Sequence, residues 1–76
     1  MNKDRRAELD KALNLLHDAA EAIEMCKDEE QEYYDNMPES LQQGDKGSTA
    51  ETAIEAMDNS MNSIEEAISE IENAQA

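Results

Sequence analysis

The side chains best suited to covalent chemistry are a single histidine and a single cysteine, His17 and Cys26. A thiol becomes a catalytic nucleophile when an imidazole within hydrogen-bond reach takes its proton. These residues are nine positions apart, and on one helix that separation is about 13 Å. We therefore interpret Cys26 as a small residue of a helix stripe. We predict no catalytic residue and no enzymatic activity.

Carboxylates are the second source of chemistry, because clusters of them hold metal ions. Di-iron sites in helical bundles use a Glu-x-x-His motif, and this sequence contains none. The segment DNSMNSIEEA, from Asp58, is loosely similar to a calcium loop but lacks the central glycine. A glycine-rich phosphate loop is also absent. The sequence therefore predicts no metal site and no cofactor.

The distribution of acids is the strongest chemical signal. Twenty acids and six bases give a net charge of −14, and after Lys11 seventeen acids face only two bases. Such a surface repels DNA, RNA and anionic membranes, so we expect no direct binding to nucleic acid or to a membrane. The expected partner is a protein with a basic, nucleic-acid-binding surface. The acids predicted to contact it are Asp28, Glu29, Glu32, Asp35, Glu65, Glu66, Glu70 and Glu72.

Two amphipathic helices must position these acids. Heptad spacing predicts a first helix over about residues 3–36, because apolar residues recur on one face. One column contains Leu9, Leu16, Ile23, Glu30 and Met37. The second predicted column contains Ala12, Ala19, Cys26 and Tyr33, and Leu13, Ala20 and Tyr34 widen the stripe. Glu30 weakens this stripe, and we expect it to face solvent or pair with Lys27.

The second helix has the more regular pattern and is predicted over about residues 49–74. Its stripe alternates spacings of three and four without exception: Ile54, Met57, Met61, Ile64, Ile68 and Ile71. The preceding STAE, from Ser48 to Glu51, matches a capping box, in which the hydroxyl and the glutamate satisfy free backbone N–H groups. This motif predicts that the helix begins after Ser48.

Residues 37–48 are predicted to form the turn. Pro38 disfavours a helical residue before it, so the first helix should end there. The PESLQQ segment is expected to form a short helical turn that Gly44 stops, and GDKG a chain reversal. Tyr33, Tyr34, Met37 and Leu41 are predicted to close this end of the hairpin. The alternative for Tyr34 is an exposed anchor in a partner's pocket.

A hairpin of 76 residues is a single domain at most, and two helices cannot enclose a core. We therefore predict an all-α helical hairpin, similar to a coiled coil, that dimerises into a four-helix bundle. The residues predicted for self-association are Leu9, Leu16, Ile23, Ile54, Met57, Met61, Ile64, Ile68 and Ile71. The N-terminus lacks an apolar run and no segment is long enough to span a bilayer, so a cytoplasmic location in a bacterial cell is expected.

Residues 29–73 resemble small acidic proteins of phages and mobile elements of Gram-positive bacteria. The resemblance rests on YDNMPESLQ, on the glycines at Gly44 and Gly47, and on the IEEAI-type second helix. It implies a phage or mobile-element setting. Small acidic proteins from phages and mobile elements often look like inhibitors of host defence nucleases or of other nucleic-acid-binding proteins. By this resemblance we expect an inhibitor.

The preferred hypothesis is therefore an inhibitor that presents a negative surface like that of DNA to a host nuclease of a CRISPR or restriction system. A dimer about 50 Å long would carry one charge per about 1.8 Å, and duplex DNA carries one per about 1.7 Å. The alternatives are a structural or assembly coiled coil or accessory subunit, and a sponge that traps a small ligand between protomers. In the coiled-coil alternative the acids only keep the protein in solution.

Overall fold

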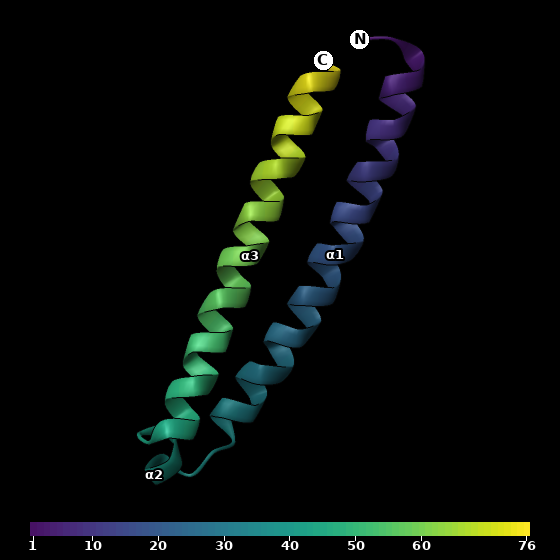
Figure 1. The fold of residues 1–76 in the computed structure, drawn as a ribbon. Helices are drawn as coiled ribbons and strands as arrows, with labels where there is room; N and C mark the ends of the chain where they lie inside the picture. Colours follow the sequence, from purple (N-terminus) through teal and green to yellow (C-terminus); the bar gives the residue numbers. More distant parts are fainter.

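The computed structural model describes all 76 residues, which form three helices and no strand. Helices α1 (Lys3–Asp35) and α3 (Asp45–Gln75) run antiparallel along their whole length, and the short α2 (Glu39–Gln42) lies at the turn (Figure 1). The hairpin is a rod measuring 58 × 15 × 13 Å. The predicted all-helical architecture with a long packed helix pair is confirmed. None of the helices combines the length and apolar character needed to cross a bilayer.

The two long helices meet along a seam in which spacings of three and four alternate. This seam is half-buried over most of its length. On α1 it contains Leu9, Leu13, Leu16, Ala20, Ile23, Lys27, Glu30 and Tyr34. On α3 it contains Gly47, Ala50, Ile54, Met57, Met61, Ile64, Ile68, Ile71 and Gln75. The α3 stripe predicted from the sequence is therefore the stripe that packs against α1.

The second predicted column of α1 was wrong in three of its four residues. Ala12 is half-buried, but Ala19, Cys26 and Tyr33 are exposed. The column that packs contains the residues predicted to widen the stripe, Leu13, Ala20 and Tyr34, together with Lys27. Adjacent residues on a helix are about 100° apart, so the two columns are neighbours on the helix surface. Both contain small and apolar residues, and the apolar pattern alone did not separate the seam from its flank.

The start of α3 also differs from the prediction, because the helix begins at Asp45 rather than near Thr49. Gly44 is its N-cap and receives no side-chain cap, while the N–H of Ser48 already donates to the carbonyl of Gly44 at 3.0 Å. Ser48 therefore lies inside the helix, and the predicted capping box does not form. GDKG is not a reversal either, because Asp45, Lys46 and Gly47 are helical and no residue has a positive φ.

Close backbone packing explains why the helix can begin so early. A Cβ at Gly47 would overlap the backbone carbonyl of Gln42, so only glycine lets α3 pass this close to α2. The other predictions for the turn hold at its start. Helix α1 ends at Asp35 with Asn36 as C-cap, and Pro38 is the N-cap of the predicted short helix.

The side chains that close the turn differ from the predicted set. Met37 is buried, with 9% of its surface exposed, as expected. Leu41 and Tyr33 point into solvent, and the amide of Gln42 instead donates to the Tyr34 carbonyl at 2.9 Å. Tyr34 is half-buried against α3. The closing contacts are therefore made by Met37, Tyr34 and a glutamine that the apolar pattern did not indicate.

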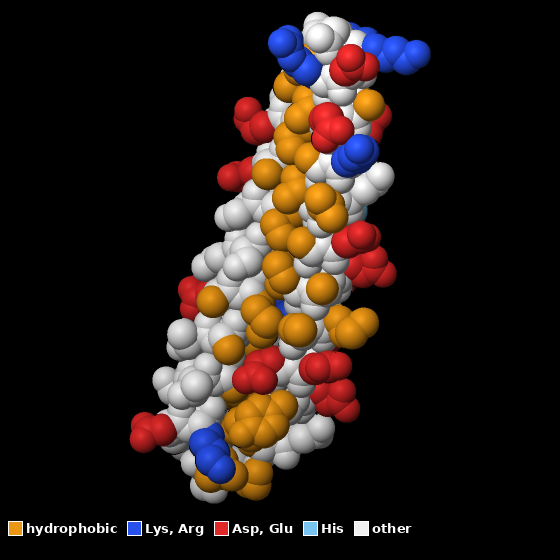
Figure 2. Space-filling view, turned by 45° about the vertical axis from the view of Figure 1, so that its right-hand side comes forward, with side chains coloured by type: hydrophobic (Ala, Val, Ile, Leu, Met, Phe, Trp, Pro, Cys, Tyr) orange, Lys and Arg blue, Asp and Glu red, His pale blue; other side chains and the backbone are white.

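Burial in one chain is slight. Only Met37, Gly47 and Ala50 are buried, and all three lie at the turn end. Apolar side chains remain visible along the length of one face, over the line where the two helices meet, with acids along both edges (Figure 2). The hairpin therefore forms one long seam without an enclosed core.

Candidate functional site

The residues that follow the seam residues by one position form a continuous acidic face. On α3 these positions include a heptad column of four acids, Glu51, Asp58, Glu65 and Glu72. Side chains one position after the seam lie on the same side of both helices, because the helices are antiparallel. The acids that we call the acidic face are Asp10, Glu21, Glu24, Asp28, Asp35, Glu51, Glu55, Asp58, Glu65 and Glu72.

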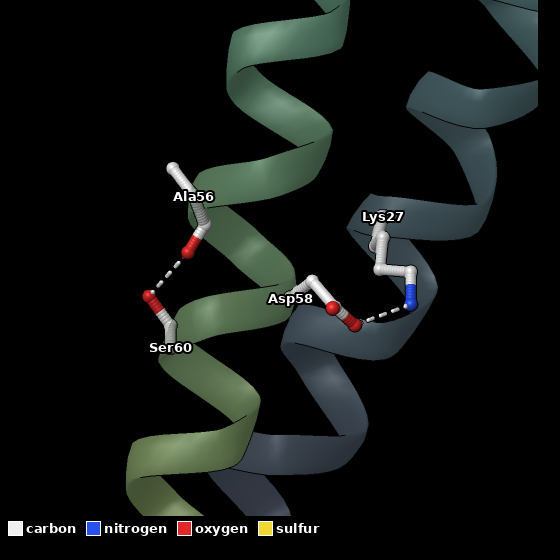
Figure 3. A network of polar contacts seen from close by, with 4 residues as sticks. All are labelled: Lys27, Ala56, Asp58 and Ser60. Atoms are coloured by element: carbon white, nitrogen blue, oxygen red, sulfur yellow. Dashed lines mark hydrogen bonds and ion pairs between the residues drawn. The ribbon is translucent and has the colours of Figure 1, made fainter.

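Side-chain hydrogen bonds join the two long helices at three points along this face. The Lys27 ammonium donates to Asp58 at 2.9 Å, and Figure 3 shows the two side chains reaching toward each other from α1 and α3. The Tyr34 hydroxyl donates to a carboxylate oxygen of Glu51 at 2.5 Å. At the open end, the amide of Gln75 donates to Asp10 at 2.8 Å. The acids of the two helices are therefore held in one surface by direct contacts.

Lys27 is the one cation within this surface. Its hydrogen bond to Asp58 raises its pKa, and the charge of Asp58 adds to the effect, so the ammonium form is favoured. Asp28 and Glu24 act in the same direction more weakly. Lys27 forms one of only two ion pairs in the molecule; the other joins Lys11 to Glu8. Most of the acids therefore have no basic partner within the chain.

Tyr34 is held in its neutral form. The bond from its hydroxyl to Glu51 is the main reason that its pKa is raised, followed by partial burial and the charge of the same carboxylate. The sequence left open whether Tyr34 closes the turn or anchors a partner. In the hairpin its hydroxyl is engaged with Glu51, and the aromatic side chain that projects into solvent is Tyr33, with 51% of its surface exposed.

The opposite flank of the seam has a different composition. The residues that precede the seam residues are mainly small or apolar. A groove on this flank is lined by Glu30, Tyr33, Asp45, Lys46 and Thr49. A groove on the acidic side is lined instead by Lys27, Tyr34, Glu51 and Asp58, among others. Tyr33 and Tyr34 therefore face opposite sides of the hairpin, and the molecule has one acidic and one apolar face.

The predicted partner-binding acids do not form one cluster. Asp28 and Asp35 lie on the acidic face in the turn half of α1, and Glu65 and Glu72 lie on the same face in the open half of α3. Glu32 and Glu66 are each two positions from seam residues on both sides, so they point away from the helix pair. Glu29 and Glu70 precede seam residues and border the apolar face instead.

The prediction missed several acids of this face. They are Asp10, Glu21, Glu24, Glu51, Glu55 and Asp58. The heptad column from Glu51 to Glu72 was visible in the sequence. The acids of α1 on this face were not recognised, because the second column of that helix had been placed on the flank with Ala19, Cys26 and Tyr33.

The side chains that could do covalent or metal chemistry do not converge in the hairpin. His17 and Cys26 are both exposed, and they lie on opposite flanks of the seam. No three side chains among His, Cys, Asp and Glu converge where they could share a metal ion. What the arrangement can do is attract and hold cationic groups, because ten carboxylates lie on one side of a rod.

Comparisons with known proteins add no relative. No protein-family model, no curated protein and no solved structure matches this chain. Function must therefore be inferred from the two faces themselves.

Proposed function

We propose that this chain is a non-enzymatic acidic interaction protein, encoded by a phage or mobile element, that inhibits a nucleic-acid-binding or defence protein of the bacterial host. The acidic face covers the basic surface where that protein binds DNA or RNA. The observation that carries the proposal is the concentration of charge on one side: ten of the twenty acids share one face with a single seam cation, Lys27. Acids that served only solubility would not need to gather on one side.

The spacing of charge along the rod supports the same proposal. A net charge of −14 along 58 Å is one charge per about 4 Å, and one strand of DNA carries one per about 3.4 Å. Two copies side by side would carry −28 along the same length, about one charge per 2 Å, against about 1.7 Å for the duplex. A groove that accepts a phosphate backbone would therefore meet carboxylates at a similar density.

Carboxylates and phosphates are also recognised by the same side chains. Arginine and lysine side chains that bind phosphate oxygens bind carboxylate oxygens with the same hydrogen-bond geometry. The carboxylates of the acidic face are largely free of intrachain ion pairs, so a partner's cations need not displace existing ones. Association should be fast and should weaken steeply with salt, because long-range attraction steers the encounter.

The experiment that tests this proposal is capture of a partner from a bacterial lysate treated with nuclease. The immobilised chain is washed with increasing salt, and released proteins are identified by mass spectrometry. The proposal expects a DNA- or RNA-binding protein that elutes at moderate salt and is displaced by added duplex DNA. Capture of a partner that is indifferent to both salt and DNA would contradict it.

A structural or assembly role is the second candidate, and the apolar face seen in Figure 2 favours it. In that case the apolar face makes the functional contact, and the acids act only through solubility. Binding to the partner would then resist salt but would be lost when an exposed apolar residue such as Leu15 becomes Glu. Salt dependence therefore separates the two candidates.

A further inference from the structure

The apolar face of the hairpin has no cover within one chain. It is made of residues that precede seam residues on both helices. Its small or apolar residues include Ala12, Leu15, Ala19, Ala22, Cys26 and Tyr33 on α1 and Thr49, Ala53, Ala56 and Ala67 on α3. Four charged residues, Glu8, Glu29, Lys46 and Glu70, lie on the same flank. Leu15 has 69% of its surface exposed, and Tyr33 has 51%. Exposing small and apolar residues along one face of this length is unusual for a monomer.

The area that the chain exposes in excess of a compact protein of its mass is similar to the area that each copy buries in a stable dimer. A compact chain of 8.5 kDa exposes about 4,650 Å², and this chain exposes 5625 Å². The excess is about 1,000 Å² per chain, so two chains that each covered it would bury about 2,000 Å² in total. This area is in the range of stable dimers.

The charge of the two halves of the rod indicates how a second copy would be oriented. The half nearest the turn, residues 20–60, has twelve acids and two bases, a net charge of −10. The open half, residues 1–19 and 61–76, has eight acids and four bases, a net charge of −4. A parallel dimer would place two turn ends of −10 together. An antiparallel dimer places each turn end against the less negative, base-containing open end.

The side chains of the face also fit an antiparallel arrangement. One heptad column on α1 contains Arg5, Ala12, Ala19, Cys26 and Tyr33, and its centre, Ala19, is the midpoint of the helix. One column on α3 contains Lys46, Ala53, Ser60, Ala67 and Ala74, and its centre, Ser60, is again the midpoint. A two-fold axis through these midpoints pairs small residues with small residues. It also brings the position of Arg5 opposite that of Tyr33 in the second copy, where a cation–π contact can form.

We propose that this apolar face binds a second copy of the chain in the antiparallel orientation, forming a four-helix bundle. The acidic faces of both copies then lie outside, on opposite sides of the bundle. Residues that the sequence assigned to self-association, such as Leu16 and Ile64, pack within one hairpin. In the proposed dimer the contacts between copies are made instead by the apolar face, whose residues precede those of the seam. This inference concerns self-association only and does not rest on the proposed partner.

The first test is the mass of the purified chain by sedimentation equilibrium, with two matched variants. Wild type should have twice the 8.5 kDa of one chain. Leu15→Glu should be largely monomeric. Met25→Glu should remain dimeric, because Met25 is 62% exposed but is two positions from the seam residues Ile23 and Lys27 and points away from both faces. A wild-type mass other than that of a dimer, or equal effects of the two variants, would overturn the proposal.

The second test measures orientation by electron–electron distance. A spin label is placed at Gln43→Cys in the turn, in a Cys26→Ala background whose dimeric mass is checked first. Antiparallel copies place the labels at opposite ends of a rod 58 Å long, so the distance should be about 50 Å. A parallel dimer would give less than about 25 Å, because adjacent helices pack about 10 Å apart. The short distance would overturn the proposed orientation, whatever the outcome of partner capture.

Discussion

Gly47 illustrates how one missing side chain determines a local structure. The backbone of α3 crosses that of α2 so closely that a Cβ at this position would overlap the Gln42 carbonyl. The sequence placed this glycine in a reversal, because glycines are frequent where φ is positive. Here the requirement is close approach of two helices, which a sequence pattern does not reveal.

Substitution of Gly47 by Ala should therefore destabilise the turn. We expect a loss of about 1–3 kcal/mol in the free energy of unfolding, the usual cost of overpacking. Gly44→Ala is the matched control, because its Cβ would lie 3.6 Å from the nearest atom, an ordinary contact. Urea unfolding at one fixed chain concentration measures both. Equal effects of the two substitutions would show that the close approach does not limit stability.

Lys27 and Tyr34 predict how the hairpin responds to alkaline pH. Both have pKa values raised above the ordinary 10.5 and 10.0, and in each case the protonated form makes the hydrogen bond. The unfolded chain therefore loses these protons at lower pH than the folded chain. Their stabilising contribution is complete below about pH 10 and is lost as pH rises through the folded pKa values. We expect stability to fall above pH 10, and to fall less in Tyr34→Phe.

Absorbance near 295 nm measures the tyrosine directly. In Tyr33→Phe, Tyr34 is the only phenol, and its ionisation midpoint should lie above 10.0. A midpoint at or below 10.0 would contradict the bond to Glu51.

At the scale of the helices, the sequence predicted the α3 stripe fully and the α1 stripe in part. The α3 seam is aliphatic at consecutive heptad positions, so only one face can pack. The turn half of the α1 seam instead contains Lys27, Glu30 and Tyr34, while the neighbouring column has Cys26 and Tyr33. Packing there depends on hydrogen bonds to Asp58 and Glu51 from the other helix, and these contacts are not visible in the local pattern of α1.

Helix boundaries lead to a further prediction. Asn2 caps α1 by accepting from the N–H of Arg5 at 2.8 Å, so Asn2→Ala should cost about 1 kcal/mol of stability. Ser48 lies inside α3 and makes no side-chain hydrogen bond, so Ser48→Ala should change stability by less than about 0.5 kcal/mol. Thermal unfolding of both variants measures the difference. A cost at Ser48 similar to that at Asn2 would indicate that α3 begins at the capping box after all.

At the scale of the whole molecule, charge repulsion opposes the compact state. With −14 in 76 residues and two ion pairs, the acids repel one another along the rod. We expect the urea midpoint to rise as NaCl is raised from about 0.01 M to about 0.3 M, because the Debye length falls from about 30 Å to below 8 Å. A fall in the midpoint over this range would mean that attractive pairs outweigh repulsion.

The two faces are a property of the whole hairpin, and the sequence predicted them only partly. Total charge and the acid-rich column of α3 could be read directly. The alignment of that column with the acids of α1 required the register of the two helices, which the contacts from Lys27 to Asp58 and from Gln75 to Asp10 establish. Without the register, acids that point outward, such as Glu32 and Glu66, could not be separated from acids of the face.

We propose that one face of the hairpin, rather than its total charge, binds the partner. Two triple variants of equal charge and composition test it, with binding to the captured partner measured by titration calorimetry. The first neutralises the acidic face by Asp28→Asn, Glu65→Gln and Glu72→Gln, and the second neutralises outward positions by Asp18→Asn, Glu32→Gln and Glu66→Gln. We expect the first variant to bind about tenfold more weakly, a loss of about 1.4 kcal/mol, and the second to bind with little change. Equal losses in both, or no loss in either, would contradict it.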